Sequence, residues 1–562
     1  MIFYDFEVFY QNWLIVCMDT KEQKTTVIVD DREELIKYHE KNIEDIWVGF
    51  NSRHYDQWIL KGIICGFNPK EINDHIILKK QGGWSFSSLL NKVELLNYDI
   101  MTSLHSLKQL EGFMGNNIKE SSVSFNIERE LSKNEIEEVI DYCKHDVNQT
   151  MEVFLNRIEE FTSHMSLITE FKLPMKYVNK TKAQLAAIIL KARRKDYNDE
   201  FEITIPNTIK LNKYKWIETW YRDKSNLNYE KRLETDIAGV PHIFAFGGLH
   251  GAIPNYYGEG IFLNVDVASY YPSLMIEYGF ASRSIEEKGR YNEIYNTRLQ
   301  LKAQKDKKQL PYKITLNSAY GAMKDKYNPL YDPLQANNVC IAGQLMLLDL
   351  IEKLENEVQL IQSNTDGILV KLKSIKDYEK VVSICSEWEM RTRMKLEYDL
   401  YTKVIQKDVN NYIIVDSKGN YKSKGAYVKK LNTLDYDLPI VNKALVNKLL
   451  HGIEIEETIN KCNELKEFQR VVKVSGKYKY AIHNNEILNE KVLRVFASRR
   501  TTDGAVYKVK NINKEKIANT PERCFIDNSD VKEKKVPRHL NKNWYISLAN
   551  KRLDDFLGED CV

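Results

Sequence analysis

The run Lys313-Ile-Thr-Leu-Asn-Ser-Ala-Tyr-Gly321 is the most informative stretch of this 562-residue sequence. Lys313, Asn317 and Tyr320 follow the i, i+4, i+7 spacing, which predicts one polar stripe along one helix. A cation on such a stripe can hold phosphate groups, while the aromatic ring can back a planar base. A solvated helix face is the alternative interpretation for any one of these residues taken alone.

Upstream, the segment Asp266-Val-Ala-Ser-Tyr-Tyr-Pro-Ser273 follows directly on an apolar run, Ile261-Phe-Leu-Asn-Val265. The run predicts a strand, and the proline predicts where the strand stops, so the Asp266 carboxylate should lie at a sheet edge facing a cleft. Arg298 and Lys302 predict a second basic stripe, on the preceding helix. A helix N-cap is the alternative role of Asp266.

A hairpin is predicted further on, where two apolar runs, Val358–Gln362 and Ile368–Leu372, flank Ser363-Asn-Thr-Asp-Gly367. Asp366-Gly367 is a favourable hairpin turn. Its carboxylate would lie beside Asp266 on a neighbouring strand, and two such groups can hold two divalent cations around a triphosphate. An ordinary turn residue is the alternative for Asp366.

A second set of acidic residues lies in the N-terminal part, on elements that bring carboxylates together. Two alternate along an expected strand, one ends the motif Asn51-Ser-Arg-His-Tyr-Asp56, and one lies four residues after Tyr142 on an expected helix. Four carboxylates can hold two Mg²⁺ or Mn²⁺ ions about 4 Å apart, with Tyr142 orienting a water. The candidate ligands are Asp5, Glu7, Asp56 and Asp146.

The pattern of apolar residues predicts a mixed α/β chain. Early strands alternate with helices, and the Lys-rich tail after residue 430 is expected to be mostly helical with strand-like pieces. The expected elements are strands at Met1–Glu7, Trp13–Asp19, Ile46–Phe50 and Lys473–Ile482, and helices at Asn134–Phe161, 285–310 and 335–356. Asp99 lies in a strand-like run and has no assigned role.

The composition is that of a globular protein, with 43% hydrophobic and 29% charged residues. The apolar run near the start, Trp13–Met18, is too short to span a bilayer, and no basic region precedes an apolar stretch. We therefore expect a cytoplasmic chain without a membrane partner. The eight cysteines form no C-x-x-C pair, which argues against a zinc ribbon or an iron–sulfur cluster.

The net charge is only +3, so charge alone says little about nucleic acid. Residues 494–516 are locally basic and suit phosphate contacts, although a solvated face explains them nearly as well. The cations are Arg494, Arg499, Arg500, Lys508, Lys510, Lys514 and Lys516.

The central motifs resemble those of family B DNA polymerases. Asp266–Ser273 is similar to motif A (D-x-x-S-L-Y-P-S), Lys313–Gly321 to motif B (K-x-x-x-N-S-x-Y-G), and Asn364–Gly367 to motif C (D-T-D-S). Phe246-Gly-Gly248 resembles the Y-x-G-G element between exonuclease and polymerase parts, and Lys424-Gly425 resembles the late palm lysine element. Together with the N-terminal set, the resemblance spans residues 5–425.

The N-terminal set resembles the DEDD-type proofreading 3′→5′ exonucleases, with D-x-E, N-x-x-x-[FY]-D and Y-x-x-x-D in this order. The resemblance implies that the four carboxylates bind metal and that Tyr142 orients the attacking water. It also implies that Asn51 contacts a single-stranded 3′ end.

For the central motifs, the resemblance implies a template-directed DNA polymerase with two Mg²⁺ or Mn²⁺ ions per active site. Asp266 and Asp366 would be its catalytic metal ligands, and Tyr271 would exclude a 2′-hydroxyl, so that deoxynucleotides are the substrates. The implied nucleotide-binding residues are Arg298, Lys302, Lys313, Asn317, Tyr320 and Tyr271. The DNA-binding candidates are Asn51, Gly247, Gly248, Lys424 and Gly425, to which the basic stretch adds Arg499 and Arg500.

The expected fold is multidomain, α/β and α+β, with an RNase H-like exonuclease domain followed by a right-hand polymerase. The expected partners are primer–template DNA and deoxynucleotides, a processivity or replication factor is a further candidate, and the chain is expected to be a monomer. The expected parts are the exonuclease domain (1–165), a connecting or N-terminal palm segment (166–260), palm (261–284 and 331–430), fingers (285–330), and thumb with the C-terminal region (431–562).

Two departures from the family pattern bear on function. Asn364 stands where motif C has an aspartate; because Asp366 is retained, we expect catalysis to persist with a changed rate or metal preference. The gaps from Asp266 to Lys313 and from Lys313 to Asp366 are 47 and 53 residues, too short for the insertions of protein-primed phage polymerases. We therefore expect a nucleic-acid primer, and the small size suggests a phage or mobile-element replicase.

Two alternative functions remain open from the sequence. A 3′→5′ exonuclease whose inactive polymerase half is only a DNA-binding platform is supported by Asn364 alone, and the intact motifs A and B oppose it. A non-catalytic replication factor would have no use for two carboxylate sets. Primer extension separates both from a polymerase.

Overall fold

The computed structural model describes residues 1–102, 104–287, 289–425, 427–511 and 513–558, and these form two compact units. Unit 1 contains residues 1–180, 431–441 and 456–547, and unit 2 contains residues 181–430, 442–455 and those from 548 onward. The chain is therefore a multidomain α/β protein; the five parts expected from the sequence stay predictions. Three helices have residues in both units: α14 (Pro439–His451), α15 (Ile455–Lys461) and α16 (Lys542–Leu557).

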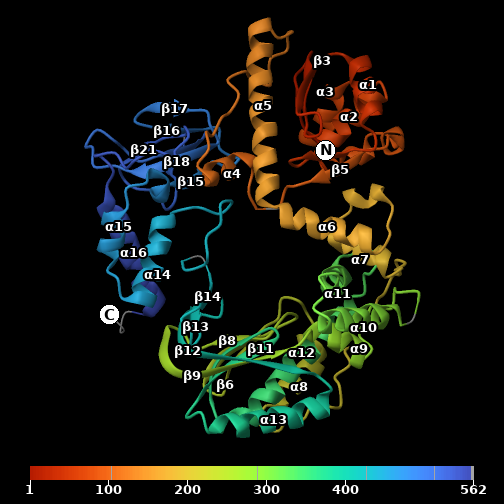
Figure 1. The fold of residues 1–562 in the computed structure, drawn as a ribbon, viewed down its shortest axis with the longest axis vertical. Helices are drawn as coiled ribbons and strands as arrows, with labels where there is room; N and C mark the ends of the chain where they lie inside the picture. The colour runs from red at the N-terminus through yellow and green to blue at the C-terminus, as the bar shows by residue number, and fades with distance from the viewer. Residues whose placement is uncertain (103, 288, 426, 512, 559–562) are drawn as a thin grey trace. The chain divides into compact units, whose positions relative to one another are not determined.

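The N-terminal part of unit 1 is a five-stranded mixed sheet in the order β3-β2-β1-β4-β5 (Figure 1). The central strand β1 pairs antiparallel with β2 and parallel with β4. The three strands expected here are confirmed. The bounds are β1 (Ile2–Val8), β2 (Trp13–Asp19), β3 (Lys24–Val29), β4 (Ile46–Gly49) and β5 (Leu96–Asp99).

Alternate residues of β1 enter two different hydrophobic cores, as the pleat of a strand requires. Phe3 packs in one core with Val139 and Val147 of α5, whereas Tyr4 packs in the other with Ile59 of α2. The odd-numbered face of β1 therefore faces α5. The helices are α1 (Arg32–Lys41), α2 (Asp56–Ile64), α3 (Pro69–Ile77), α4 (Leu107–Met114), α5 (Lys133–Asn156) and α6 (Ile158–Glu170).

The C-terminal part of unit 1 is built mainly from strands, so the expected mostly helical tail is wrong here. Its sheets have the orders β15-β18-β21 and β17-β16-β19-β20. Stretches such as Tyr507-Lys-Val-Lys510 carry the two-residue period of a strand, which the high lysine content obscured. The strands are β15 (Arg470–Lys473), β16 (Tyr480–His483), β17 (Glu486–Leu488), β18 (Val492–Ala497), β19 (Tyr507–Lys510), β20 (Asn513–Lys516) and β21 (Cys524–Ile526).

Arg494 of β18 is fully buried and joins two segments of unit 1. Its guanidinium donates to the carbonyl oxygens of Gly112 (3.1 Å), Asn116 (2.6 Å) and Ser529 (2.6 Å). Burial lowers its pKa to about 10. The expectation that Arg494 suits phosphate contact is therefore wrong, because the side chain points into the interior of unit 1.

Unit 2 is centred on a nine-stranded antiparallel sheet in the order β14-β13-β12-β9-β11-β10-β8-β7-β6. The predicted hairpin is confirmed as β10 and β11, with its turn one residue earlier than expected, at Thr365-Asp366. The strands are β6 (Leu233–Ile237), β7 (Val240–Phe244), β8 (His250–Ala252), β9 (Tyr256–Val267), β10 (Gln359–Asn364), β11 (Gly367–Leu372), β12 (Leu396–Asp408), β13 (Asn411–Val415) and β14 (Tyr421–Lys424).

Helix α12 (Pro333–Leu354) is the long apolar helix of unit 2. By length and composition alone it could cross a membrane, with a mean hydropathy of 1.2, but 94% of that window is buried inside the protein. Such burial is typical of a core helix, so it is weak evidence for a membrane span. The other helices are α7 (Lys182–Ile189), α8 (Lys215–Arg222), α9 (Tyr270–Glu277), α10 (Arg290–Ala303), α11 (Gln309–Lys324) and α13 (Asp377–Thr392).

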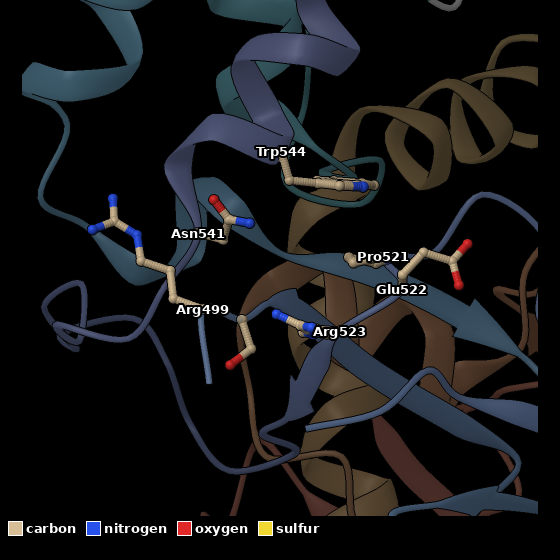
Figure 2. A pocket seen from close by; sticks show the side chains of 7 residues that line it. Arg499, Pro521, Glu522, Arg523, Asn541 and Trp544 are labelled. Carbon is tan, nitrogen blue, oxygen red and sulfur yellow. The ribbon is translucent and has the colours of Figure 1, made fainter. Parts of the chain in front are cut away.

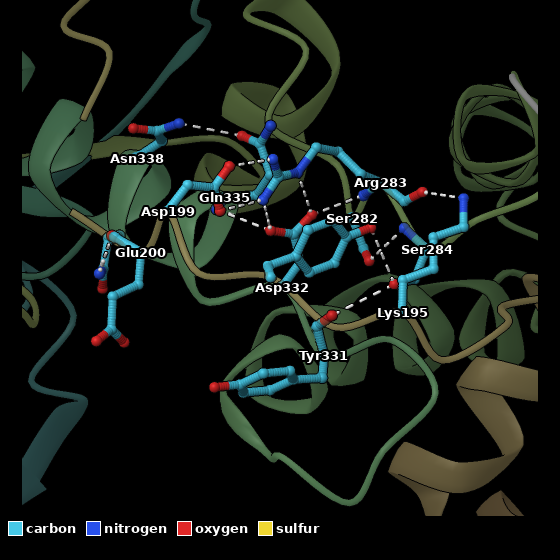
Figure 3. Close-up of polar contacts among 12 residues, drawn as sticks. Lys195, Asp199, Glu200, Ser282, Arg283, Ser284, Tyr331, Asp332, Gln335 and Asn338 are labelled. Atoms are coloured by element: carbon cyan, nitrogen blue, oxygen red, sulfur yellow. Dashed lines mark hydrogen bonds and ion pairs between the residues drawn. The ribbon is translucent and has the colours of Figure 1, made fainter. Parts of the chain in front are cut away.

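An ionic network fixes the start of α12 (Figure 3). The fully buried Asp332 caps the helix by accepting from the backbone N–H of Gln335, and it also accepts from the Arg283 guanidinium at 2.7 Å. The same guanidinium donates to both carboxylate oxygens of Asp199, at 2.6 and 3.0 Å. The loop after α9 is thereby tied to α12, which positions the helix that carries Tyr271.

Candidate active sites

Asp266 and Asp366 lie on adjacent strands of the nine-stranded sheet. Asp266 of β9 pairs with Gly367 of β11, and the backbone N–H of Val267 donates to the Asp366 carbonyl at 2.7 Å. Burial and repulsion from Asp366 raise the pKa of Asp266 to about 6, and burial also raises the pKa of Asp366. Two neighbouring carboxylates that repel one another, Asp266 half-buried and Asp366 exposed, fit a divalent cation with oxygen ligands.

A cavity of about 510 Å³ opens beside these two carboxylates. It brings together five of the six predicted nucleotide-binding residues. The sixth, Tyr320, packs against the wall residue Tyr271, with 4.4 Å between ring centroids. Gln309 and Glu397 also line the cavity, and sequence reasoning missed them. The predicted lining residues are Arg298, Lys302, Lys313, Asn317 and Tyr271.

The three cations of this cavity have different surroundings. Arg298 is 6% exposed and donates to the Ser269 hydroxyl at 2.7 Å, and burial lowers its pKa. The ammonium of Lys302 lies 3.1 Å from a Glu397 carboxylate oxygen. Lys313 is exposed, and no carboxylate among the described residues pairs with it. Apart from Asp266 and Asp366, the lining therefore contains three cations and one carboxylate, that of Glu397.

Two glycines allow the backbone to approach the turn that carries Asp366. A Cβ on Gly367 would lie 1.9 Å from an Asp266 carboxylate oxygen, and a Cβ on Gly248 would lie 2.6 Å from the Thr365 hydroxyl. The Gln344 amide of α12 holds the adjoining segment by donating to the Gly247 carbonyl at 2.9 Å. The structure thus places the Phe246-Gly-Gly248 element beside the turn, and the close approach explains glycine at 367.

Asn364 and Lys424 lie on strands around the same turn. Asn364 of β10 pairs with His250 of β8 across the two strands. Burial and the Lys424 ammonium lower the pKa of His250, and the same ammonium opposes the burial-driven rise in the pKa of Asp366. Lys424 therefore lies near the Asp366 carboxylate. Gly425, which follows it, has a φ of 103°, a conformation that favours glycine.

The four carboxylates predicted as metal ligands in the N-terminal part meet around β1. Asp56 accepts from the backbone N–H of Phe6 at 3.1 Å, and the ligand atoms of Asp5, Glu7 and Cys143 lie within 4.8 Å of one another. Burial, reinforced by neighbouring carboxylates, raises the pKa values of Asp5 and Glu7. Burial also raises the pKa of Asp56 to about 7. Such mutually repelling oxygen donors fit Mg²⁺ or Mn²⁺.

Lys108 of α4 places a cation inside this acidic site, and sequence reasoning missed it. Its ammonium forms ion pairs with Asp146 and, at 3.0 Å, with Glu111, and it lies 4.7 Å from the centre of the Tyr142 ring. Burial opposes its charge, but the two carboxylates outweigh burial and raise the pKa of Lys108. Burial raises the pKa of Asp146 to about 6 against the effect of Lys108. A lone lysine in this segment offers no sequence signal.

Asp99, unassigned from the sequence, shapes the loop between β4 and α2. Its carboxylate accepts from the backbone N–H groups of Asn51 (2.9 Å), Arg53 (3.0 Å) and Met101 (2.8 Å). Asn51 itself has a left-handed φ of 63°. Asp99 therefore positions the loop that presents Asn51 and leads into Asp56.

A cavity of about 480 Å³ adjoins Tyr142 and Lys108. Phe125 lines it, is 44% exposed and stacks on Phe9 with 4.9 Å between ring centroids. Lys491, from the C-terminal part of unit 1, lines it as well. An exposed aromatic ring beside cations suits an unpaired nucleotide, and neither Phe125 nor Lys491 belongs to a sequence motif.

The basic stretch 494–516 does not act as one surface. Lys508 pairs with Glu515 at 3.0 Å, and Lys516 pairs with Glu522. Arg500 lies 3.1 Å from a ring nitrogen of His539. Arg499 lines a different cavity, and neither arginine lines the cavities beside the two carboxylate sets.

No protein-family model and no curated protein matches the sequence. Among solved structures, the chain is similar to one described as the structure of the family B DNA polymerase from the hyperthermophilic archaeon Pyrobaculum calidifontis. The sequence identity is 13%, the TM-score is 0.44, and the match covers 99% of this chain and 77% of that chain. At this TM-score the likeness carries no functional argument, so the function rests on the geometry of the two sites.

Proposed function

We propose that this chain is a DNA-directed DNA polymerase of family B with a proofreading 3′→5′ exonuclease. The observation that carries the proposal is the position of Asp266 and Asp366 at a cavity lined by Arg298, Lys302 and Lys313. Carboxylates for divalent cations, beside cations for a polyphosphate, are what phosphoryl transfer from a nucleoside triphosphate requires.

In this proposal, Asp266 and Asp366 would hold Mg²⁺ or Mn²⁺, which would supply Lewis-acid chemistry and neutralising charge beside the triphosphate. The arginine and lysine side chains of the cavity orient the triphosphate. The Ser269 hydroxyl fixes the Arg298 guanidinium. Tyr271, packed on Tyr320 and lining the cavity, is the residue that would exclude a 2′-hydroxyl.

The site in unit 1 supports the exonuclease half of the proposal. Asp5, Glu7, Asp56 and Asp146 would hold Mg²⁺ or Mn²⁺ there, which would supply Lewis-acid chemistry for hydrolysis of a phosphodiester. Burial and Asp146 keep the Tyr142 phenol protonated by raising its pKa, so it can hydrogen-bond that water. Lys108 neutralises part of the carboxylate charge, and Phe125 offers a stacking face for the unpaired terminal base.

The nature of the primer belongs to the same proposal. The described residues between Asp266 and the hairpin form α9, α10, α11 and α12. This compact arrangement supports a nucleic-acid primer, because the protein-primed polymerases carry insertions in these gaps.

The test is primer extension and primer degradation by the wild type, Asp366→Asn and Asp5→Ala. Asp366→Asn should lose extension about a thousandfold and keep degradation, because only the unit 2 metal site is damaged. Asp5→Ala should lose degradation and keep extension, because only the unit 1 metal site is damaged. If the wild type degrades the primer but extends it with neither Mg²⁺ nor Mn²⁺, the alternative of an exonuclease with an inactive polymerase half is correct.

A further inference from the structure

Unit 1 contains another polar cavity, of about 480 Å³, and no residue of either carboxylate set lines it (Figure 2). It lies between the end of β18, the segment before β21 and the first turn of α16. Its lining includes Arg499, Pro521, Glu522, Arg523, Asn541 and Trp544. The lining has two cations, one carboxylate, an amide and a large aromatic ring, which is unlike a hydrophobic packing defect.

The cavity has an unbalanced positive charge. The side chains of Arg499 and Arg523 are exposed, and neither takes part in an ion pair within the described part of the chain. Glu522, the acidic residue of the lining, is already paired with Lys516. Burial and the nearby Arg499 lower the pKa of Lys542. The two guanidiniums therefore lack a counter-charge that an anionic ligand would supply.

Trp544 gives the cavity a rigid aromatic wall. Its ring packs edge-on against Tyr545, with 4.9 Å between centroids and an interplanar angle of 88°. Tyr545 is buried and is fixed by hydrogen bonds to the Phe468 carbonyl and from the Ala497 N–H. Figure 2 shows the indole edge-on above Pro521 and Arg523, so one ring face is turned toward these two lining residues.

We propose that this cavity binds one nucleotide of single-stranded DNA. The base stacks on Trp544, the guanidiniums of Arg499 and Arg523 bind the flanking phosphates, and the Asn541 amide hydrogen-bonds the base edge. The strand must be unpaired, because a base within a duplex has no free face for the indole. The choice of DNA rests on the proposed function: the cavity would hold an unpaired strand of the primer–template.

Photo-crosslinking locates the site. A dT12 oligonucleotide that carries one 5-iododeoxyuridine is irradiated with the full chain in EDTA, and the crosslinked peptide is identified by mass spectrometry. We expect a crosslink in the peptide that contains Trp544. Crosslinks confined to peptides around Tyr142 or Phe125 would overturn the proposal.

Binding measurements separate stacking from general charge attraction. The wild type should bind dT12 about tenfold more tightly than an abasic 12-mer, which keeps the phosphates and lacks the bases. Trp544→Ala should remove most of this preference, whereas Trp544→Phe should keep it. Arg523→Ala should lower the affinity for both oligonucleotides. It should also reduce the slope of log K against log salt concentration by the amount expected for about one phosphate contact. An unchanged preference in Trp544→Ala would contradict the proposal.

Arg129→Ala is the matched control, since it removes one arginine charge from unit 1. Its guanidinium is already paired with Glu135 at 2.8 Å, so dT12 affinity should not change. If Arg129→Ala lost as much dT12 affinity as Arg523→Ala, the effect would come from net charge alone, and the assignment would be overturned. Neither assay requires catalysis, so a wild type without primer extension would contradict the polymerase function and leave the result for this cavity unaffected.

Discussion

In both carboxylate sites, neighbouring acidic side chains repel one another, but different groups surround them in the two sites. In unit 1, four acidic side chains meet around β1, and the ammonium of Lys108 pairs with one of them, Asp146. In unit 2, the half-buried Asp266 and the exposed Asp366 line a cavity together with Arg298, Lys302 and Lys313. We relate this difference to the charge of the substrate proposed for each site. In the proposed function, a terminal phosphodiester carries a single charge, so one cation of the protein balances it, whereas a triphosphate needs several cations.

The largest effect that separates the two sites is expected from Lys108→Met. The change leaves Glu111 and Asp146 buried without their cation, so degradation should fall about a hundredfold and the free energy of unfolding of unit 1 by about 3 kcal/mol. Degradation of a single-stranded oligonucleotide and thermal unfolding measure these effects. Primer extension should persist.

Lys41→Met is the control for this change, because Lys41 forms an exposed pair with Glu22 in the same unit. It should alter neither degradation nor unfolding measurably. An equal loss of extension in Lys108→Met would show that the substitution unfolds the chain as a whole.

Gly367→Ala should damage the other site alone. The added Cβ would meet an Asp266 oxygen at 1.9 Å and the Val265 carbonyl at 2.9 Å, so the carboxylate must move. A displacement of this order should lower primer extension by ten- to a hundredfold, as estimated from the cost of about 1 Å of misplacement. Gly476→Ala, with no atom within 4 Å of the added Cβ, should behave as wild type. Extension at the wild-type rate in Gly367→Ala would mean that Asp266 is not positioned by this contact.

Asn364→Asp tests whether two aspartates suffice in unit 2. The change places a carboxylate beside His250 and should alter the extension rate by less than about tenfold, with a shift in the ratio of Mn²⁺- to Mg²⁺-supported rates. Steady-state extension with each metal measures both quantities. A gain of a thousandfold would show that the natural site is impaired.

The smallest effect expected is a pH-dependent stabilisation by metal. The raised pKa values of Asp56, about 7, and Asp146, about 6, mean that the folded chain binds more protons than the unfolded chain from about pH 4 upward. Metal-free stability should therefore fall as pH rises through this window. Mn²⁺ requires the ionised carboxylates, so it should raise the unfolding temperature by a few degrees more at pH 8 than at pH 5.5.

Thermal scans with EDTA or Mn²⁺ at the two pH values measure this difference. Asp5→Ala should reduce it, because that variant loses one ligand of the unit 1 site. A larger metal effect at pH 5.5 than at pH 8 would contradict the assignment of these carboxylates as metal ligands.

The motifs could be predicted where the candidate site residues repeat with the period of a single strand or helix. Alternation along β1 placed Asp5 and Glu7 on one face, and helical spacing placed Lys313 and Asn317 on one stripe of α11. The hairpin of β10 and β11 followed from two apolar runs and a turn, although the turn lies one residue earlier than expected. The prediction failed in the tail, because lysines on the strands concealed the alternation of polar and apolar residues.

The sequence by itself determined which acidic and basic side chains share a strand or helix face, because their spacing along single strands and helices is enough to place them there. Only the tertiary structure decided what surrounds them. It put Lys108 among the acids of unit 1, buried Arg494, and required glycine at 367 beside Asp266. The reason is physical: burial, ion pairing and close approach depend on residues far apart in the chain, and no local period records which of them will meet.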